Sequence, residues 1–588
     1  MFTRLLVANR GEIALRILRA CRELEIATIA VYSDADREAP WLRAADEAHR
    51  LGPAAAAESY LAGDRILAVA ADTGAEAVHP GYGFLAENAD FAAAVTDAGL
   101  AWVGPPAAAI AQMGDKLSAR AVAQAAGVPV VPGTDEATTD PAEVAAFADE
   151  HGLPVAIKAA FGGGGRGLKV VHDPADLADA LEAAQREAIA SFGRGEVYVE
   201  RYLPRPRHIE AQVLADTHGR CLFLGERDCS AQRRHQKLIE EAPAPHLPAD
   251  VRAALGTAAV RVSEQVGYTG AGTVEFLYAD GEFFFLEMNT RLQVEHPVTE
   301  LVTGLDLVHW QLRIADEQAL DLTQDDVVVR GHAIEARINA ENVGAGFVPS
   351  PGLITGWRAP AGPGVRVDAA GEAGWTIPSA YDSLVAKLIA YGADREDARR
   401  KLARALDEFV VEGVPTTIDF HRVAVAHPDF VAGAVSTVSV ETEWDLSAIA
   451  AAAPAAPGRG EHPPTRTLTV EVGGKRVEVA VFDPEEVPHG PAPRAPARRE
   501  SPVPRPAATS AATAPTVLSA PMQGTIVKTT AEAGQAVAAG DLIVVLEAMK
   551  MENHVTAERD GVLAELHVAA GDVVNTGDPL ATITPGAG

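Results

Sequence analysis

The sequence predicts a multi-domain protein of α/β and α+β character that ends in a small all-β domain. With 588 residues, the chain is too long for one hydrophobic core, so several domains are expected. The first 110 residues alternate short apolar runs with helical patterns, which predicts a parallel sheet covered by helices. The C-terminal block repeats its pattern after 37 residues, which predicts a two-fold quasi-symmetric β-sandwich.

The composition excludes some classes of function. The formal net charge is -31, from 50 Lys and Arg against 81 Asp and Glu. Nucleic-acid binders need basic patches that neutralise phosphates, so we expect no nucleic-acid partner. The three cysteines fit neither a zinc site nor a disulfide framework, and we expect a cytoplasmic protein. Charges interrupt the N-terminal segment, and no run of 18 uncharged apolar residues occurs, so neither a signal peptide nor a membrane span is expected.

The first predicted domain spans residues 1–114. Apolar runs at 5–8, 26–32, 77–79 and 101–103 predict its strands. Between the first two runs, Ile13, Ile17 and Cys21 recur at every fourth position, which gives a helix one apolar stripe. The spacing therefore predicts a helix that covers one face of a parallel sheet.

The second predicted domain spans residues 115–315 and contains four consecutive glycines at 162–165. They follow an apolar strand that ends at Lys158. Glycine lets backbone N–H groups approach and cradle an anion, but such a run is equally compatible with a flexible turn. The GxxxxGK[ST] pattern of a Walker A loop is absent.

Residues 272–296 predict a β-hairpin that turns at Asp280–Gly281. Glu287 and Asn289 are two positions apart, so both face the same side of their strand. A two-residue turn would place Glu275 on the opposite side from Glu287, whereas a three-residue loop would place both on one side. Because two carboxylates and an amide oxygen on one face suit Mg²⁺, we expect the three-residue loop. The alternative is an edge strand whose acidic side chains simply face solvent.

Residues 330–445 form a third block of mixed character, and residues 446–515 form a linker rich in Ala and Pro. Such a linker cannot bury enough apolar surface to order itself. Residues 467–482 interrupt it with a period-two pattern around Gly473 and Gly474, which predicts a hairpin. This hairpin is either a contact for a partner or a transient strand pair.

The last block, residues 516–588, carries the internal repeat. Gly524, Gly534 and Gly540 recur 37 positions later as Gly561, Gly571 and Gly577. The seam between the two copies falls in the sequence EAMKME, which places Lys550 at the tip of a turn between two methionines. Exposed methionines around a turn suggest that another protein recognises this tip.

These motifs carry a resemblance to known families. Residues 1–445 resemble a biotin carboxylase, which is an ATP-grasp enzyme, and residues 516–588 resemble a biotin carboxyl carrier domain. The stretches that match are RLLVANRGEIALRI, HPGYGFLAEN, KAAFGGGGRGLK, RPRHIEAQV, GERDCSAQRRHQKLIEEAP, EMNTRLQVEHPVTE, YDSLVAKLI and EAMKM. The resemblance implies a Rossmann-like N-terminal domain, an ATP-grasp domain, a biotin carboxylase C-terminal domain and a lipoyl-like flattened barrel. Ala231 departs from the pattern, since a bulkier apolar residue is commoner there.

The resemblance also implies roles for individual residues. It places the ATP site at Lys116, Lys158, Gly164, Gly165, Glu200, Arg201, Tyr202, Leu203, His208, Gln232 and His235. It assigns Mg²⁺ or Mn²⁺ to Glu275, Glu287 and Asn289, and bicarbonate to Lys237, Arg291, Gln293 and the Val294 backbone. It makes Glu295 the general base, Arg337 the cation facing the biotin ureido group, Tyr82 a biotin-pocket residue and Lys550 the biotinylated lysine. Glu295, Arg291, Arg337 and Lys237 are thus the expected catalytic residues.

The implied activity is the carboxylation of biotin with ATP and bicarbonate. No segment is left over for a carboxyltransferase domain, so we expect a separate β subunit to supply it, together with a biotin protein ligase that modifies the lysine. A dimer of the biotin carboxylase domains is a further expectation. The leading hypothesis is the α subunit of an acetyl-, propionyl- or longer acyl-CoA carboxylase of lipid metabolism. The alternatives are the matching subunit of a two-subunit pyruvate carboxylase and a non-catalytic biotin carrier.

The first testable prediction concerns Lys550. Intact-mass measurement of the protein expressed with a biotin protein ligase is expected to show one added biotin. The Lys550→Ala variant is expected to lose this mass, because a methyl group cannot form the amide bond. The matched control is Lys528→Ala in the same domain, which keeps the modification. Retention of biotin in Lys550→Ala would refute the assignment.

Overall fold

The computed structural model describes residues 1–134, 137–159, 169–192, 195–452, 466–472, 475–481, 516–520, 524–548, 551–574 and 578–584. The chain divides into two compact units, Met1–Ala455 and Ala456–Gly588. Each unit is described by itself. Within the described ranges, no helix combines the length and the apolar character needed to cross a membrane.

The first unit begins with a five-stranded parallel sheet in the order β3-β2-β1-β4-β5. Helix α1 (Gly11–Glu23) buries Ile13, Ile17 and Cys21 against it, as the periodicity predicted. The strands are β1 (Arg4–Val7), β2 (Ala27–Ser33), β3 (Glu47–Gly52), β4 (Ala77–His79) and β5 (Ala101–Trp102). The prediction of a parallel α/β sheet is confirmed.

An eight-stranded sheet forms the centre of the first unit, in the order β13-β12-β9-β10-β11-β14-β21-β19. It runs through the second and third predicted blocks, because β14, β21 and β19 extend the sheet begun by β9 to β13. Its strands are β9 (Arg207–Ala215), β10 (Cys221–Arg233), β11 (Gln236–Ala242), β12 (Gly270–Ala279), β13 (Glu282–Asn289), β14 (His332–Asn339), β19 (Val365–Ala369) and β21 (Leu384–Gly392).

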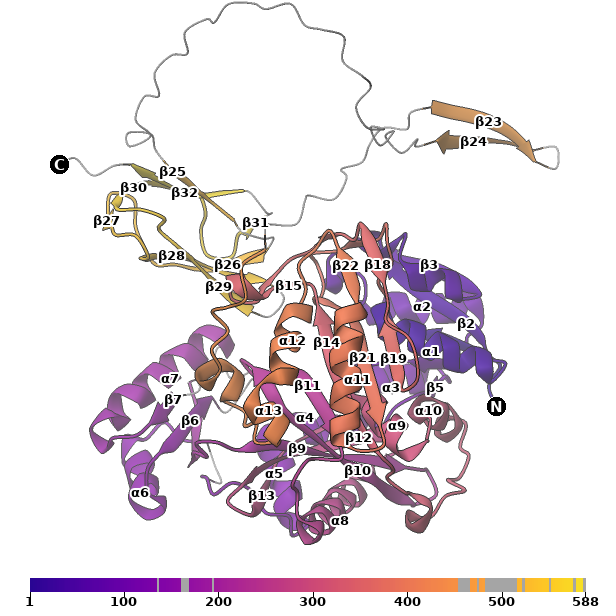
Figure 1. The fold of residues 1–588 in the computed structure, drawn as a ribbon, viewed down its shortest axis with the longest axis horizontal. Coiled ribbons are helices and arrows are strands. Elements are labelled where there is room, and N and C mark those ends of the chain that lie inside the picture. Colours follow the sequence, from indigo (N-terminus) through magenta and orange to yellow (C-terminus); the bar gives the residue numbers. More distant parts are fainter. Residues whose placement is uncertain are drawn as a thin grey trace, which may run out of the picture. The chain divides into compact units, whose positions relative to one another are not determined.

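Helices cover this sheet. Ile334, Ala336 and Ile338 of β14 pack against Ala398 and Leu402 of helix α11, which lies over β14 and β21 (Figure 1). The helices of the unit other than α1 are α2 (Gly63–Thr73), α3 (Ala89–Asp97), α4 (Ala107–Gly114), α5 (Lys116–Ala125), α6 (Pro141–His151), α7 (Leu177–Phe192), α8 (Ala249–Gln265), α9 (His296–Thr303), α10 (Leu307–Ala315), α11 (Arg395–Glu408), α12 (Ile418–Ala426) and α13 (Pro428–Ala432). Because Ile334, Ala336 and Ile338 of β14 face α11, the alternate residues 335 and 337 face away from this helix.

A smaller three-stranded sheet in the order β7-β6-β8 packs with α6 and α7 around a core of its own. Its strands are β6 (Val155–Ala159), β7 (Lys169–Val171) and β8 (Val197–Arg201). The glycine run with Gly164 and Gly165 lies between β6 and β7 in the sequence and outside the described residues. Three short strand pairs complete the unit: β15 (Glu341–Asn342) with β16 (Val348–Pro349), β17 (Gly352–Leu353) with β20 (Thr376–Ile377), and β18 (Gly356–Arg358) with β22 (Val410–Glu412).

The predicted three-residue loop of the 272–296 hairpin is wrong. Ala279 pairs with Glu282, so the turn has two residues, Asp280 and Gly281, and both have positive φ. Farther along, Phe276 pairs with Phe285 but Glu275 pairs with Glu287, which leaves Leu286 as a one-residue bulge. The bulge brings Glu275 and Glu287 to the same face, so the expected placement of both carboxylates holds for a different reason.

The second unit contains a hairpin and a β-sandwich. Strands β23 (Arg466–Val472) and β24 (Lys475–Val481) pair antiparallel, as the period-two pattern predicted. The sandwich consists of the sheets β25-β32-β30-β27 and β29-β28-β26-β31. Its strands are β25 (Thr516–Ser519), β26 (Gly524–Thr529), β27 (Ala536–Val537), β28 (Leu542–Ala548), β29 (Met551–Thr556), β30 (Gly561–Leu566), β31 (Val573–Val574) and β32 (Pro579–Thr584).

The sandwich has the predicted quasi-symmetry. Strands β26, β27 and β28 begin 37 residues before β30, β31 and β32. Exchanging β25 with β29, β26 with β30, β27 with β31 and β28 with β32 turns one sheet order into the other. The internal repeat of the sequence is therefore a repeat of the structure.

A buried acidic residue links the central sheet to α11. Glu241 of β11 accepts hydrogen bonds from Arg395 at 2.6 and 2.9 Å, and its Oε2 lies 2.7 Å from His332 Nε2. Burial alone would raise the pKa of Glu241, but the bonds to His332 and Arg395 outweigh it and lower the pKa to about 2. The ionised carboxylate thus fastens α11 to the sheet.

We predict a pH-dependent stability difference for Glu241→Gln. Because the folded-state pKa is lowered, the stabilisation by Glu241 is fully present above pH 4.5 and is lost as the pH falls to about 2. The variant is expected to be less stable by about 3 kcal/mol at pH 7, and the difference should vanish near pH 2. Urea unfolding monitored at several pH values checks this. A constant difference across the range would contradict the prediction.

Candidate active site

A described pocket lies between the small sheet, α5 and β13 of the first unit. Its lining includes four predicted site residues, Lys116, Lys158, Glu200 and Glu287. The apolar part of the lining consists of Leu117, Val131, Tyr198, Phe285 and Leu286.

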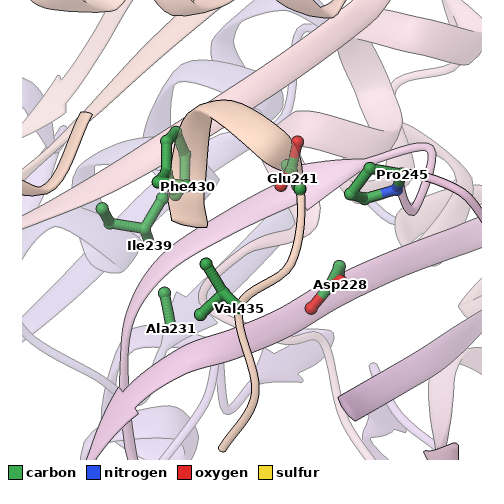
Figure 2. Close-up of a pocket in the computed structure, with 8 residues that line it drawn as sticks. Asp228, Ala231, Ile239, Glu241, Pro245, Phe430 and Val435 are labelled. Atoms are coloured by element: carbon green, nitrogen blue, oxygen red, sulfur yellow. The ribbon is translucent and has the colours of Figure 1, made fainter. Parts of the chain in front are cut away.

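A second, small pocket is lined by Asp228, Ala231, Ile239, Glu241, Pro245, Phe430, Gly433 and Val435 (Figure 2). Its two carboxylates are already paired, Asp228 with Arg207 and Glu241 with Arg395. None of the predicted site residues that the structure describes lines this cavity. The pocket between the small sheet and β13 is therefore the candidate active site.

The nucleotide-side residues come from β6, β8 and the start of α5. Lys158 forms an ion pair with Glu200 and lies 5.9 Å from the ring of Tyr198. Burial lowers the pKa of Lys116, an effect that Glu287 opposes and Lys158 reinforces. Two cations beside an open carboxylate suit a polyphosphate that arrives with a metal ion.

The segment after Glu200 combines polar and apolar groups. Leu203 is buried with Val131 and Phe284 in a small cluster, and the Arg201 guanidinium lies 5.9 Å from the Phe284 ring. The Tyr202 backbone N–H donates to Pro154 O at 3.0 Å. The segment thus presents an apolar surface, fixed by packing and a backbone hydrogen bond, against which a nucleotide base can stack.

The acidic trio occupies one face of β12 and β13. Asn289 Nδ2 donates to Glu275 Oε1 at 2.8 Å, and the bulge places Glu287 opposite Glu275. Desolvation in the pocket raises the pKa of Glu287, although its side chain is exposed, and the neighbouring Glu275 carboxylate raises it further. No side-chain hydrogen bond joins Glu287 to another residue of the described ranges. Two neighbouring carboxylates, of which Glu287 has no side-chain hydrogen bond in the described ranges, are suited to bind a hard divalent cation.

Lys237 of β11 holds three buried carboxylates together. Its Nζ donates to Glu210 at 2.5 Å, to Glu295 at 2.7 Å and to Glu275 at 2.8 Å. Burial would lower the pKa of Lys237, but the three carboxylates outweigh it and raise the pKa well above its ordinary value. Lys237 is therefore a permanent cation in this structure.

Glu295 is fully buried between two cations. Its Oε1 accepts from Lys237, and its Oε2 accepts from Arg337 Nη2 at 2.9 Å. Burial would raise the pKa of Glu295, but Lys237 and Arg337 hold it well below the ordinary value. Glu295 is ionised and can accept a proton from a group placed beside it. A second nitrogen of Arg337, Nε, donates to Glu240 at 2.5 Å.

Arg291 spans the groups predicted to bind an anion. It donates from Nε to Glu87 at 2.8 Å, from Nη2 to Asn289 at 3.0 Å and from Nη1 to Gln293 at 3.1 Å. Gln293 in turn donates to Glu275 at 3.1 Å. Gln293 thus connects Arg291 to Glu275, one of the three carboxylates held by Lys237.

A chain of polar contacts reaches the predicted biotin residue. The Tyr82 hydroxyl donates to Glu12, and Glu12 Oε1 lies 3.1 Å from the fully buried Lys387 Nζ. Lys387 also donates to the backbone oxygen of Val294 at 2.8 Å. The chain connects Tyr82 to the loop that carries Gln293 and Glu295.

The remaining predicted contacts lie on β9, β10 and their turn. His208 Nε2 is 2.9 Å from Glu275 Oε2, and Gln232 is the register partner of Lys237. His235 lies in the turn after β10, where both it and Arg234 have positive φ. His208 and Gln232 thus adjoin the carboxylate cluster.

Several site residues escaped the sequence analysis. Glu210 and Arg227 form a fully buried ion pair at 2.5 Å beside Lys237. Glu87 and Glu240 accept hydrogen bonds from Arg291 and Arg337. Lys387 donates to the backbone oxygen of Val294. A signal did exist for Glu210, because His208, Glu210 and Gln212 alternate along one strand. Glu87 and Lys387 lie in the matching stretches HPGYGFLAEN and YDSLVAKLI, but the sequence analysis gave neither residue a role, because their partners come from distant segments.

Comparison with known families follows the same division of the chain. Residues 1–110 match the biotin carboxylase N-terminal domain, and residues 115–323 match the ATP-binding domain of the carbamoyl-phosphate synthase L chain. Residues 335–442 match the biotin carboxylase C-terminal domain, and residues 516–583 match the biotin-requiring enzyme domain.

A full-length relative decides the family. The biotin-dependent acyl-coenzyme A carboxylase alpha3 subunit of Mycobacterium leprae is 50% identical over 590 residues, which cover 99% of this chain and 98% of the relative. The chain belongs to the family of biotin-dependent acyl-CoA carboxylase alpha subunits. Biotin carboxylase 1 of Bacillus subtilis is 51% identical over 444 residues, which cover 75% of this chain and 99% of the relative.

Solved structures agree with this fold. A biotin carboxylase from Campylobacter jejuni, in a complex described as β,γ-ATP, is 44% identical with a TM-score of 0.72, over 75% of this chain and 98% of that one. The biotin carboxylase domain of 2-oxoglutarate carboxylase from Hydrogenobacter thermophilus, solved with MgADP, ADP and bicarbonate, is 45% identical with a TM-score of 0.71, over 75% and 97%.

The predicted biotinylation site lies outside the described residues. Ala548 of β28 pairs with Met551 of β29, and Met549 and Lys550 lie between them in the sequence. The two strands that flank Lys550 are therefore joined by a short connection.

Proposed function

We propose that this protein uses ATP and bicarbonate to carboxylate a biotin group attached to Lys550, and that a separate carboxyltransferase subunit passes the carboxyl group to an acyl-CoA. The observation that carries the proposal is the pairing of an ionised Glu295 with Lys237 and Arg337, beside the acidic trio. This arrangement supplies a base, two cations and a metal-binding face within one cluster.

Bicarbonate is a weak and negatively charged nucleophile. Lys237, Arg291 and Gln293 are assigned to bind it, because Lys237 and Gln293 both donate to Glu275 and Arg291 donates to Gln293. Glu295 takes the bicarbonate proton as the anion attacks the γ-phosphate of ATP, and ADP leaves, which gives carboxyphosphate. Carboxyphosphate breaks down to CO₂ and phosphate; the phosphate takes the proton of the ureido nitrogen, and that nitrogen bonds to CO₂. Cations fixed before the reaction stabilise the charge that develops, so little reorganisation is needed.

Glu275, Glu287 and Asn289 are the residues that would hold Mg²⁺ or Mn²⁺. When bound, the ion would neutralise negative charge during phosphoryl transfer. Lys116 and Lys158 add positive charge on the other side of the pocket. The open carboxylate of Glu287 fits this assignment, because an acidic side chain without a protein partner is free to bind a cation.

Arg337 and Tyr82 are assigned to the tip of the biotin arm. Arg337 retains its charge because Glu240 and Glu295 hold it, and it can stabilise negative charge on a ureido oxygen. Glu12 and Lys387 keep Tyr82 and the 293–295 loop in fixed positions. The linker of residues 446–515 allows the carrier domain to visit a second active site.

An acyl-CoA is the proposed final acceptor. Supporting it, the Mycobacterium leprae relative has the same extent as this chain, carrier domain included. A pyruvate carboxylase subunit from Methanothermobacter thermautotrophicus is 52% identical but matches only 75% of the chain. The partners proposed are therefore a biotin protein ligase and a carboxyltransferase β subunit. Three unpaired cysteines suit the reducing cytoplasm as the site of action.

Glu295→Gln tests the proposed base. The purified wild-type protein is expected to hydrolyse ATP in a bicarbonate-dependent reaction that free biotin stimulates. The bicarbonate-dependent rate of ATP hydrolysis is expected to be at least about 100-fold lower in the variant, because the amide cannot accept the proton. Glu282→Gln, an exposed change at the start of β13, is the control. Unchanged hydrolysis in Glu295→Gln would mean that another group is the base.

Reconstitution tests the proposed acceptor. The biotinylated protein, mixed with a candidate β subunit, is expected to carboxylate acetyl-, propionyl- or long-chain acyl-CoA when labelled bicarbonate is supplied. Pyruvate is the comparison substrate in the same assay. Label found in oxaloacetate and in no acyl-CoA would replace the acyl-CoA proposal with a pyruvate carboxylase.

A further inference from the structure

A second pair of buried carboxylates lies behind the active site. Glu335 of β14 is fully buried, and neither of its carboxylate oxygens has a hydrogen-bond partner in the described part of the chain. Its register partner across the antiparallel pair of β11 and β14 is Glu240, which is also fully buried. One oxygen of Glu240 is bound by Arg337, and the other, Oε2, has no partner in the same ranges.

Two ionised carboxylates cannot occupy these positions at low energetic cost. Directly opposite residues of an antiparallel pair have Cβ atoms about 4.5–5.5 Å apart, so the two carboxyl groups can touch. A buried charge without a partner is strongly unfavourable, whereas a neutral acid needs only one acceptor for its O–H. The free Oε2 of Glu240 is an acceptor of this kind. The two partnerless groups therefore complement each other once Glu335 carries a proton.

The charges around Glu335 agree with a neutral acid. Burial raises its pKa well above the ordinary value. Lys387 of β21 and Arg337 oppose this rise, whereas Glu240 and Glu295 reinforce it. Lys387 is already engaged by Glu12 and by the backbone oxygen of Val294. Helix α11 adds no charge on this side, because it packs against the opposite face of β14.

Arg337 lies on the same face of the sheet as the pair of Glu240 and Glu335. Arg337 lies two residues after Glu335, on the same side of β14. Its Nε is held by Glu240 Oε1 at 2.5 Å and its Nη2 by Glu295 Oε2 at 2.9 Å. Any movement of the Glu240 carboxylate would therefore move the guanidinium.

We propose that Glu335 is a positioning residue for carboxyl transfer: as a neutral acid it donates a hydrogen bond to Glu240 and so fixes the carboxylate that holds Arg337. The inference rests on the proposed function, in which Arg337 faces the biotin tip. Glu335 itself touches no substrate. Its effect is transmitted through Glu240 and is confined to the step that uses Arg337.

Two substitutions separate this role from a merely structural one. In Glu335→Gln, the amide N–H₂ replaces the acid O–H as the donor to Glu240. In Glu335→Leu, a side chain of similar size removes the donor without leaving a large void. Glu226→Gln is the matched control, since Glu226 is also buried with one partnerless oxygen but is bound by Arg252.

The kinetic experiment uses the full-length chain with ATP, bicarbonate and free biotin. Glu335→Leu is expected to raise the KM for biotin, or lower the biotin-stimulated kcat, by at least about tenfold, while the KM for ATP stays within about twofold. Glu335→Gln is expected to stay within about threefold of the wild type in every constant. A Glu335→Leu protein with wild-type constants would overturn the proposal. So would a folded Glu335→Gln protein as defective as Glu335→Leu.

An infrared measurement tests the proton directly and requires no turnover. The spectrum of the wild-type protein is expected to contain a carbonyl band of a buried neutral carboxylic acid at neutral pH. The band should be absent in Glu335→Gln and present in Glu226→Gln. A wild type that turns over but gives no Glu335-dependent band would overturn the hydrogen bond proposed here. A wild type that shows the band but no bicarbonate-dependent ATP hydrolysis would overturn the proposed function instead.

Discussion

The Lys237 ammonium group is the interaction on which the candidate site depends. Three carboxylates, Glu210, Glu275 and Glu295, lie within 2.8 Å of its Nζ, and all three are buried. Without a shared cation, these carboxylates would repel one another in a medium that screens charge poorly. The same ammonium keeps Glu295 ionised. The cohesion of the charged core and the ionised state of Glu295 therefore have one cause.

The eight-stranded sheet makes this concentration of charge possible. Its site-facing side carries charged residues from β9, β10, β11, β12, β13, β14 and β21, while the other side of β14 packs against α11 through apolar side chains. A rigid sheet fixes the spacing between cations and carboxylates before substrates arrive. The small sheet of β6, β7 and β8 adds Lys158 and Glu200, which form the other wall of the pocket.

Two one-residue bulges aim the charged side chains. Leu286 is the extra residue that brings Glu287 opposite Glu275. Ala231 and Gln232 of β10 pair with Ile239 and Lys237 of β11, so Leu238 is the extra residue on β11. This second bulge places Lys237 and Glu240 on the same side of a strand although they are three residues apart. Bulges next to active sites commonly redirect side chains in this way.

The sequence by itself determined the domain order, the parallel N-terminal sheet, the hairpins and the repeat of the carrier domain, because periodicity and turn residues are local signals. It also marked Glu275, Glu287 and Asn289 as a group, although the loop length that we inferred from them was wrong. Only the tertiary structure showed that β14 and β21 continue the sheet of the ATP-binding domain. It alone placed Glu12, Glu87, Glu240, Glu335 and Lys387 around the site. Bulges and cross-sheet ion pairs depend on neighbouring strands and on residues hundreds of positions away, so no local pattern encodes them.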